Sequence, residues 1–153
     1  MNDMKQHYML RLKWSLQALA CSSKEQISLY PNFVCPGDEL VLEFDQHNTM
    51  VQKKCKLSVK AQSALNALGK FLEKHSGDSY KRMYLEPSGL NEPEWIDIRN
   101  LAKTALNAFD WEHELPPKDR GDIYKNKRIN TNQVNPIDVS VKFKKQWICT
   151  LIY

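Results

Sequence analysis

Apolar residues recur at three- and four-residue intervals in several stretches of the chain, the spacing that places them on one face of a helix. Two stretches show the pattern most clearly, residues 58–76 and residues 92–111. In the second stretch the stripe consists of Trp95, Ile98, Leu101, Ala102, Ala105, Leu106 and Phe109. The sequence therefore predicts a helix over each stretch, the latter opened by a capping box of Asn91 and Glu94.

Two further helices are predicted in the first third of the chain, each with a strand as the alternative. Over residues 8–20, apolar positions fit both a helix and an every-second-residue strand, but no β-branched residue lies between Met4 and Ser22, which favours the helix. Over residues 38–54, Asp38 follows a Pro-Gly pair and is expected to cap the helix. A strand through residues 40–44 remains the alternative there.

The C-terminal third has a different pattern. Residues 118–136 are rich in turn-forming residues, and apolar and polar positions then alternate from Ile137. This alternation predicts an antiparallel pair of strands over 137–143 and 147–152. The expected fold is α+β: one domain over residues 1–153, in which a helical N-terminal two-thirds packs against a small antiparallel C-terminal β-sheet, with residues 8–16 or 122–129 as candidates for a third strand.

Composition narrows the class of protein. The chain has 153 residues, of which 42% are hydrophobic and 26% charged, as in ordinary globular domains. No apolar run approaches the roughly 20 residues that a spanning helix needs. The first residues lack the apolar core of a signal peptide, and the four cysteines show no metal or redox spacing. We expect a cytoplasmic protein with reduced thiols and no contact with membranes.

Two places in the sequence could carry chemistry. Cys35 precedes a predicted helix start, which would lower the pKa of its thiol, but Asp38 opposes this effect and a buried apolar anchor is the simpler interpretation. The run Glu112-His113-Glu114 matches no metal-binding motif, and a solvated helix end accounts for it. We therefore predict no catalytic residue, no metal and no cofactor.

The charge distribution points to nucleic acid as one kind of partner. The net charge is +4, and the basic surplus gathers from Lys118 onward. With aromatic residues interleaved, a C-terminal basic face bearing Lys142, Lys144 and Lys145 could bind nucleic acid, although a solvated strand face explains the same residues. Nucleic-acid binding, or a small enzyme of unknown chemistry, is therefore the alternative to a protein-binding function.

Acidic residues form two groups that could bind a protein partner. Glu39 and Glu43 belong to the acidic start of the helix predicted over 38–54, and Glu92 and Glu94 to the start of the helix over 92–111. Carboxylates at helix starts also stabilise the helix itself. We nevertheless predict these four glutamates as the first candidates for a partner-binding surface.

A family resemblance rests on the segment from Ile27 to Val34 and on the acidic, apolar segment from Asp38 to Asp45 that follows it. With these segments, its size and its lack of catalytic motifs, the chain resembles the small bacterial immunity proteins of contact-dependent and other polymorphic toxin systems. The resemblance implies a non-catalytic protein that neutralises a toxin by binding it directly. Inhibitors of nuclease toxins are often acidic, so the net basic charge implies either a local acidic docking patch or a toxin that is not a nuclease.

Overall fold

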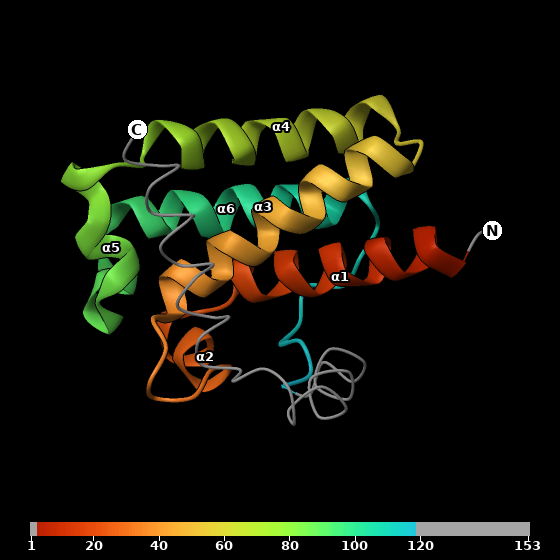
Figure 1. The fold of residues 1–153 in the computed structure, drawn as a ribbon. Coiled ribbons are helices and arrows are strands. Elements are labelled where there is room, and N and C mark those ends of the chain that lie inside the picture. Colours follow the sequence, from red (N-terminus) through yellow and green to blue (C-terminus); the bar gives the residue numbers. More distant parts are fainter. Residues whose placement is uncertain (1–2, 119–153) are drawn as a thin grey trace, which may run out of the picture.

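The computed structural model describes residues 3–118, and all regular elements in that range are helical. Four long helices, α1, α3, α4 and α6, cross the molecule, and the shorter elements connect their ends (Figure 1). In chain order the elements are α1 (Asp3–Ala20), α2 (Ser23–Ser28), α3 (Pro36–Lys54), α4 (Val59–Lys74), the 3-10 helix η1 (Asp78–Tyr80), α5 (Lys81–Leu85), the 3-10 helix η2 (Pro87–Asn91) and α6 (Pro93–Ala108).

The predicted α+β fold is wrong for the part of the chain that the structure describes. Residues 3–118 contain no strand, and residues 8–16 and 40–44, for which a strand was the alternative, are helical. The long helices bury their apolar stripes against one another, so they need no sheet to cover them. The strands predicted over 137–143 and 147–152 lie outside the described residues.

The four predicted long helices are present, with shifted ends. The helix predicted over 8–20 begins at Asp3, and the helix predicted over 58–76 is α4, capped by the Ser58 hydroxyl. The helix predicted over 38–54 begins at Pro36, a residue favoured in the first turn because it has no N–H to satisfy. Asp38 is therefore not its cap but lies buried inside its first turn.

The helix predicted over 92–111 begins at Pro93 and ends at Ala108. Its N-cap is Glu92, so the capping box predicted from Asn91 and Glu94 is wrong. At the other end, Asp110 has a φ of 56°, and the N–H groups of Asp110 and Trp111 donate to the carbonyls of Asn107 and Leu106. This is a Schellman motif with aspartate where glycine is usual, so the residue types alone do not mark the end of the helix.

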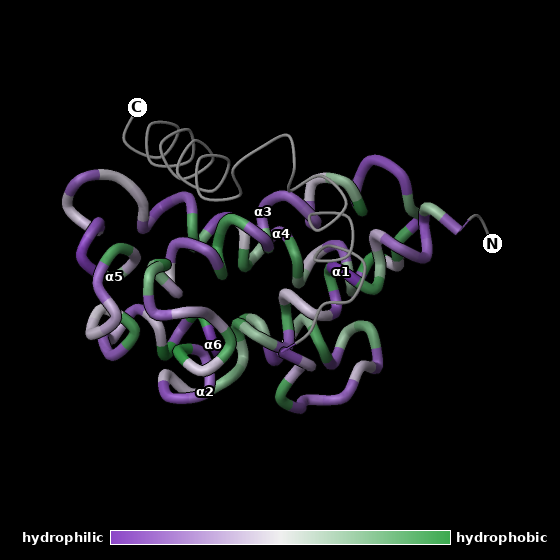
Figure 2. Tube along the Cα trace, turned by 60° about the horizontal axis from the view of Figure 1, so that its bottom comes forward, coloured by the Kyte–Doolittle hydropathy of each residue, from purple (hydrophilic) through white to green (hydrophobic). Residues whose placement is uncertain are grey.

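Helix α6 packs between α1 and α4, and α1 also packs along α3. The fully buried side chains of Trp95, Ile98 and Leu106 from α6 join Leu12 and Leu16 of α1 in the core. Apolar and polar segments alternate along the helices, as one-sided burial requires (Figure 2). Within residues 3–118, no helix is both long enough and apolar enough to cross a membrane.

Side chains satisfy the carbonyls at the C-terminal end of α1. The Gln26 amide of α2 donates to the carbonyls of Ala18 and Leu19, at 3.1 Å each. Arg99 of α6 donates to the Cys21 carbonyl and to the Gln26 side-chain oxygen, both at 2.9 Å, and to the Leu90 carbonyl at 2.7 Å. These bonds define the Arg99–Gln26 network, which joins α1, α2, η2 and α6 at one point.

Replacing Arg99 by methionine should lower the free energy of unfolding by about 3 kcal/mol. Hydrogen bonds to a charged group contribute roughly 1.5–3 kcal/mol each, and the substitution leaves buried acceptors without donors. Urea unfolding measures the change. Lys103→Met removes the same charge one turn later on an exposed position of α6 and should change stability by less than about 0.5 kcal/mol. Equal losses in the two variants would show that the network contributes nothing specific.

Two glycines have opposite packing environments. A Cβ added at Gly89 would lie 2.2 Å from the Arg82 carbonyl oxygen and 2.7 Å from the Cα of Met83. The chain therefore needs glycine here for η2 to lie against α5. Gly69, in the interior of α4, has space, since its nearest neighbour would be the Asn48 amide nitrogen at 3.8 Å.

The same substitution should consequently have opposite effects at the two sites. Gly89→Ala should destabilise the protein by about 2 kcal/mol or more, because backbone atoms must move. Gly69→Ala should stabilise it by up to about 1 kcal/mol, because alanine has the higher helix propensity. Thermal unfolding of both variants tests the packing, and a Gly89→Ala protein as stable as the parent would contradict it.

Candidate functional site

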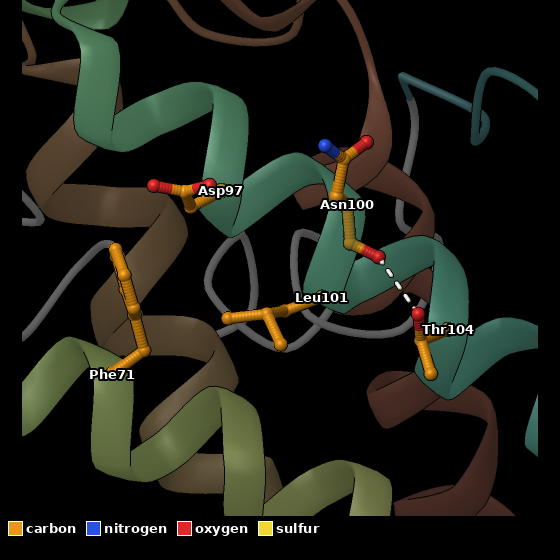
Figure 3. A pocket seen from close by; sticks show the side chains of 5 residues that line it. All are labelled: Phe71, Asp97, Asn100, Leu101 and Thr104. Atoms are coloured by element: carbon orange, nitrogen blue, oxygen red, sulfur yellow. Dashed lines mark hydrogen bonds between the residues drawn. The ribbon is translucent and has the colours of Figure 1, made fainter.

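A groove of about 450 Å³ opens to solvent between α4 and α6. Phe71 from α4 and Leu101 from α6 supply its apolar surface, and Asp97, Asn100 and Thr104 of α6 supply polar groups. Figure 3 shows Phe71 on one helix facing the side chains of Asp97 and Leu101 on the other. We refer to these five residues as the α4–α6 groove.

Helical spacing explains how one sequence segment lines the groove. Asp97, Leu101 and Thr104 follow one another at intervals of four and three residues, so they share a face of α6. The buried residues Trp95, Ile98 and Ala102 occupy the neighbouring core face. The groove is therefore the boundary between the buried and the exposed sides of α6.

Aromatic contacts hold Phe71 in place. Its ring stacks on the His75 ring, with centroids 4.0 Å apart, and the His75 ring meets Tyr80 edge-on at 5.2 Å. The Nδ1 atom of His75 lies 2.9 Å from the Phe71 carbonyl oxygen, which fixes the imidazole as well. The apolar wall of the groove is thus ordered before any ligand arrives.

Asp97 is the one charged residue among the five that line the groove. It is exposed, and no lysine or arginine in residues 3–118 forms a salt bridge with its carboxylate. An unpaired carboxylate beside two apolar side chains is suited to a ligand that carries both a positive charge and an apolar group.

The structure separates the four predicted glutamates. Glu92 and Glu94 lie at the start of α6, where Glu92 forms a salt bridge with Arg82 at 3.6 Å. Glu94 precedes Asp97 by three residues and lies near Tyr84, whose pKa is raised by burial and then by the Glu94 charge. Glu39 and Glu43 lie half-buried on α3 and do not line the groove.

Sequence reasoning missed Asp97, Leu101 and Phe71 as site residues. Leu101 belongs to the apolar stripe predicted over 92–111, and Phe71 lies in the stretch predicted as a helix over 58–76, whereas both are only partly buried. The spacing of Asp97, Leu101 and Thr104 was a signal on α6, but the sequence does not show that α4 lies beside this face. The groove needs both helices.

The structure describes both places that were considered for chemistry. Cys35 is the half-buried N-cap residue of α3 and makes no side-chain capping bond. His113 lies in the exposed segment after α6, with its Nε2 atom 3.3 Å from the Ala20 carbonyl oxygen, so the prediction of a helix end at residues 112–114 is wrong. The described residues contain no group of three or more histidine, cysteine or acidic side chains placed to hold a metal ion.

The segment from Ile27 to Val34 runs from the last turn of α2 into the connection before α3. Leu29 and Tyr30 are buried, and the Val34 N–H donates to the Pro31 carbonyl at 3.2 Å. Phe33 is 76% exposed. Single exposed apolar residues are common on protein surfaces, so Phe33 alone does not define a site.

Outside the groove, His47 has a strongly lowered pKa. Burial lowers the pKa of His47 on α3 to about 4, and the positive charges of Arg11 and His7 on α1 act in the same direction. The neutral imidazole is therefore the form that the folded protein accommodates. The unfolded chain, with an ordinary histidine pKa near 6.5, takes up a proton first as the pH falls.

Stability should accordingly fall as the pH is lowered from about 6.5 toward 4, the window between the unfolded and folded pKa values. Between about pH 7 and about pH 4.5 the His47 contribution to this loss should be about 2 kcal/mol, at roughly 1.36 kcal/mol for each pKa unit. Urea unfolding at both pH values should show a smaller loss for His47→Gln than for the parent. Gln46→Ala, at an exposed neighbouring position without a titratable group, is the control and should keep the parent's pH dependence.

Comparisons with protein-family models, with curated proteins and with solved structures gave no match to this chain.

Proposed function

We propose that the chain is a non-catalytic binding protein, and specifically an immunity protein that neutralises a cognate toxin by direct contact in the cytoplasm. The observation that carries the proposal is the α4–α6 groove, where the exposed Asp97 carboxylate lies beside Phe71 and Leu101. Apolar anchors next to a few oriented polar groups are typical of binding surfaces.

The charge of the described helices supports a protein as the partner. Residues 3–118 contain 15 lysines and arginines and 15 aspartates and glutamates, so the surplus of +4 belongs to residues 119–153. A neutral body with a local carboxylate favours specific docking over general attraction to polyanions. A local acidic docking patch is therefore compatible with a chain that is basic as a whole.

Because the net positive charge is concentrated in residues 119–153, nucleic-acid binding is the second candidate function. Lys142, Lys144 and Lys145 all belong to the basic segment 119–153, apart from the groove in the sequence. If this segment binds nucleic acid, affinity should fall steeply with added salt, because bound lysines release counterions from the phosphates.

The test of the immunity proposal is growth rescue. The protein encoded beside this chain is expressed in a heterologous host, and the chain should restore growth if that protein is toxic. Asp97→Lys should weaken protection, with a loss of affinity of at least about tenfold, or about 1.4 kcal/mol. Glu73→Lys makes the same reversal of charge on α4, two residues from Phe71 and hence on another side of that helix, and should protect as the parent does.

A neighbour without toxicity, or a toxic neighbour that the chain does not neutralise, would contradict the immunity function. Salt-sensitive binding of labelled single-stranded RNA, lost in the triple alanine variant of Lys142, Lys144 and Lys145, would support the second candidate in its place.

A further inference from the structure

We propose that the α4–α6 groove receives a cationic amphipathic helix of the partner protein. The inference rests on the proposed protein-binding function and adds the chemistry of the partner. It follows from the shape of the groove, its charge and the order of its apolar wall.

The shape of the groove favours a helix as its occupant. Two helices flank it, and side-chain ridges of a third helix can pack into the channel between such a pair. Pairing with an extended peptide needs a free sheet edge, and residues 3–118 provide none. Of these two recognition modes, helix in groove is therefore the one that this surface can provide.

The charge of the groove favours lysine or arginine on that helix. Asp97 is exposed without a salt-bridge partner in the described residues, and Glu94 lies three residues earlier, about 4.5 Å along the helix axis at roughly 1.5 Å per residue. Two cations three or four residues apart on the partner would match this spacing. An acidic helix would meet repulsion at the same place.

The apolar wall favours a leucine or an aromatic residue one turn from those cations. Leu101 follows Asp97 by one turn, and Phe71 faces both residues from α4 (Figure 3). Because His75 and Tyr80 already order the Phe71 ring, little side-chain entropy is lost when an apolar group contacts it. The partner thus needs a basic residue and an apolar residue on one helical face.

The test uses a synthetic helical peptide of about 18 residues, or about five turns, with lysine and leucine on one face, and a matched peptide with glutamate in place of lysine. Fluorescence anisotropy should show binding of the lysine peptide at least about tenfold tighter than that of the glutamate peptide, a difference of about 1.4 kcal/mol. Asp97→Lys should reverse this preference, and Glu73→Lys should leave it unchanged. Circular dichroism verifies that both variants are folded.

Equal binding of the two peptides, or a preference that Asp97→Lys does not alter, would overturn the inference. Growth rescue by the parent chain together with either result would leave the immunity function standing and reject only the cationic helix as its ligand. Failure of growth rescue with retained, Asp97-dependent peptide binding would instead reject the toxin as the partner and support the groove as a site for cationic helices.

Discussion

The structure depends on the hydrogen bonds made by the last carbonyl groups of α1 in the interior of the molecule. The last carbonyls of a helix have no partner within it, and burying them without one costs free energy. Here the Gln26 amide and the Arg99 guanidinium supply donors from two other helices. Cys21 contributes too, since its thiol donates to the Gln17 carbonyl, and burial raises the pKa of that thiol to about 11. These hydrogen bonds thereby fix the positions of α2 and α6 relative to the end of α1.

The hydrogen bonds at the end of α1 also orient the groove, because Arg99 and the groove residue Asp97 both belong to α6. Arg99 and Asp97 are two residues apart, about 200° around the helix, so one reaches α1 while the other faces the groove. The Arg99–Gln26 network opposes rotation of α6, as does the cation–π contact of the guanidinium with Trp95, 5.7 Å from the ring centroid. The exposed face of the helix is consequently as well defined as its buried face.

The long helices could be predicted from the sequence because each carries an apolar stripe. Their first residues were less predictable, since neither Asp38 nor Asn91 is the N-cap that its residue type suggests. The short helix α2 begins with a capping box, in which the Ser22 N–H donates to the Glu25 carboxylate at 3.1 Å and lowers the pKa of that carboxyl group. The predicted α+β fold was wrong for residues 3–118, because the apolar stripe of one helix does not reveal which other element covers it. The end of α6 was misplaced because Asp110 adopts a left-handed conformation that residue type alone does not indicate. The groove was missed because it depends on the contact between α4 and α6, which no local pattern encodes.

The central claim is that the chain acts by presenting the α4–α6 groove to a protein partner. Under the proposed immunity function, hydrogen–deuterium exchange of the complex between the chain and its toxin tests this claim most directly. The account predicts slower exchange around Phe71 on α4 and from Glu94 to Thr104 on α6, with exchange in α1 and α3 unchanged. Protection of α1 or α3 with no change in α6 would contradict it.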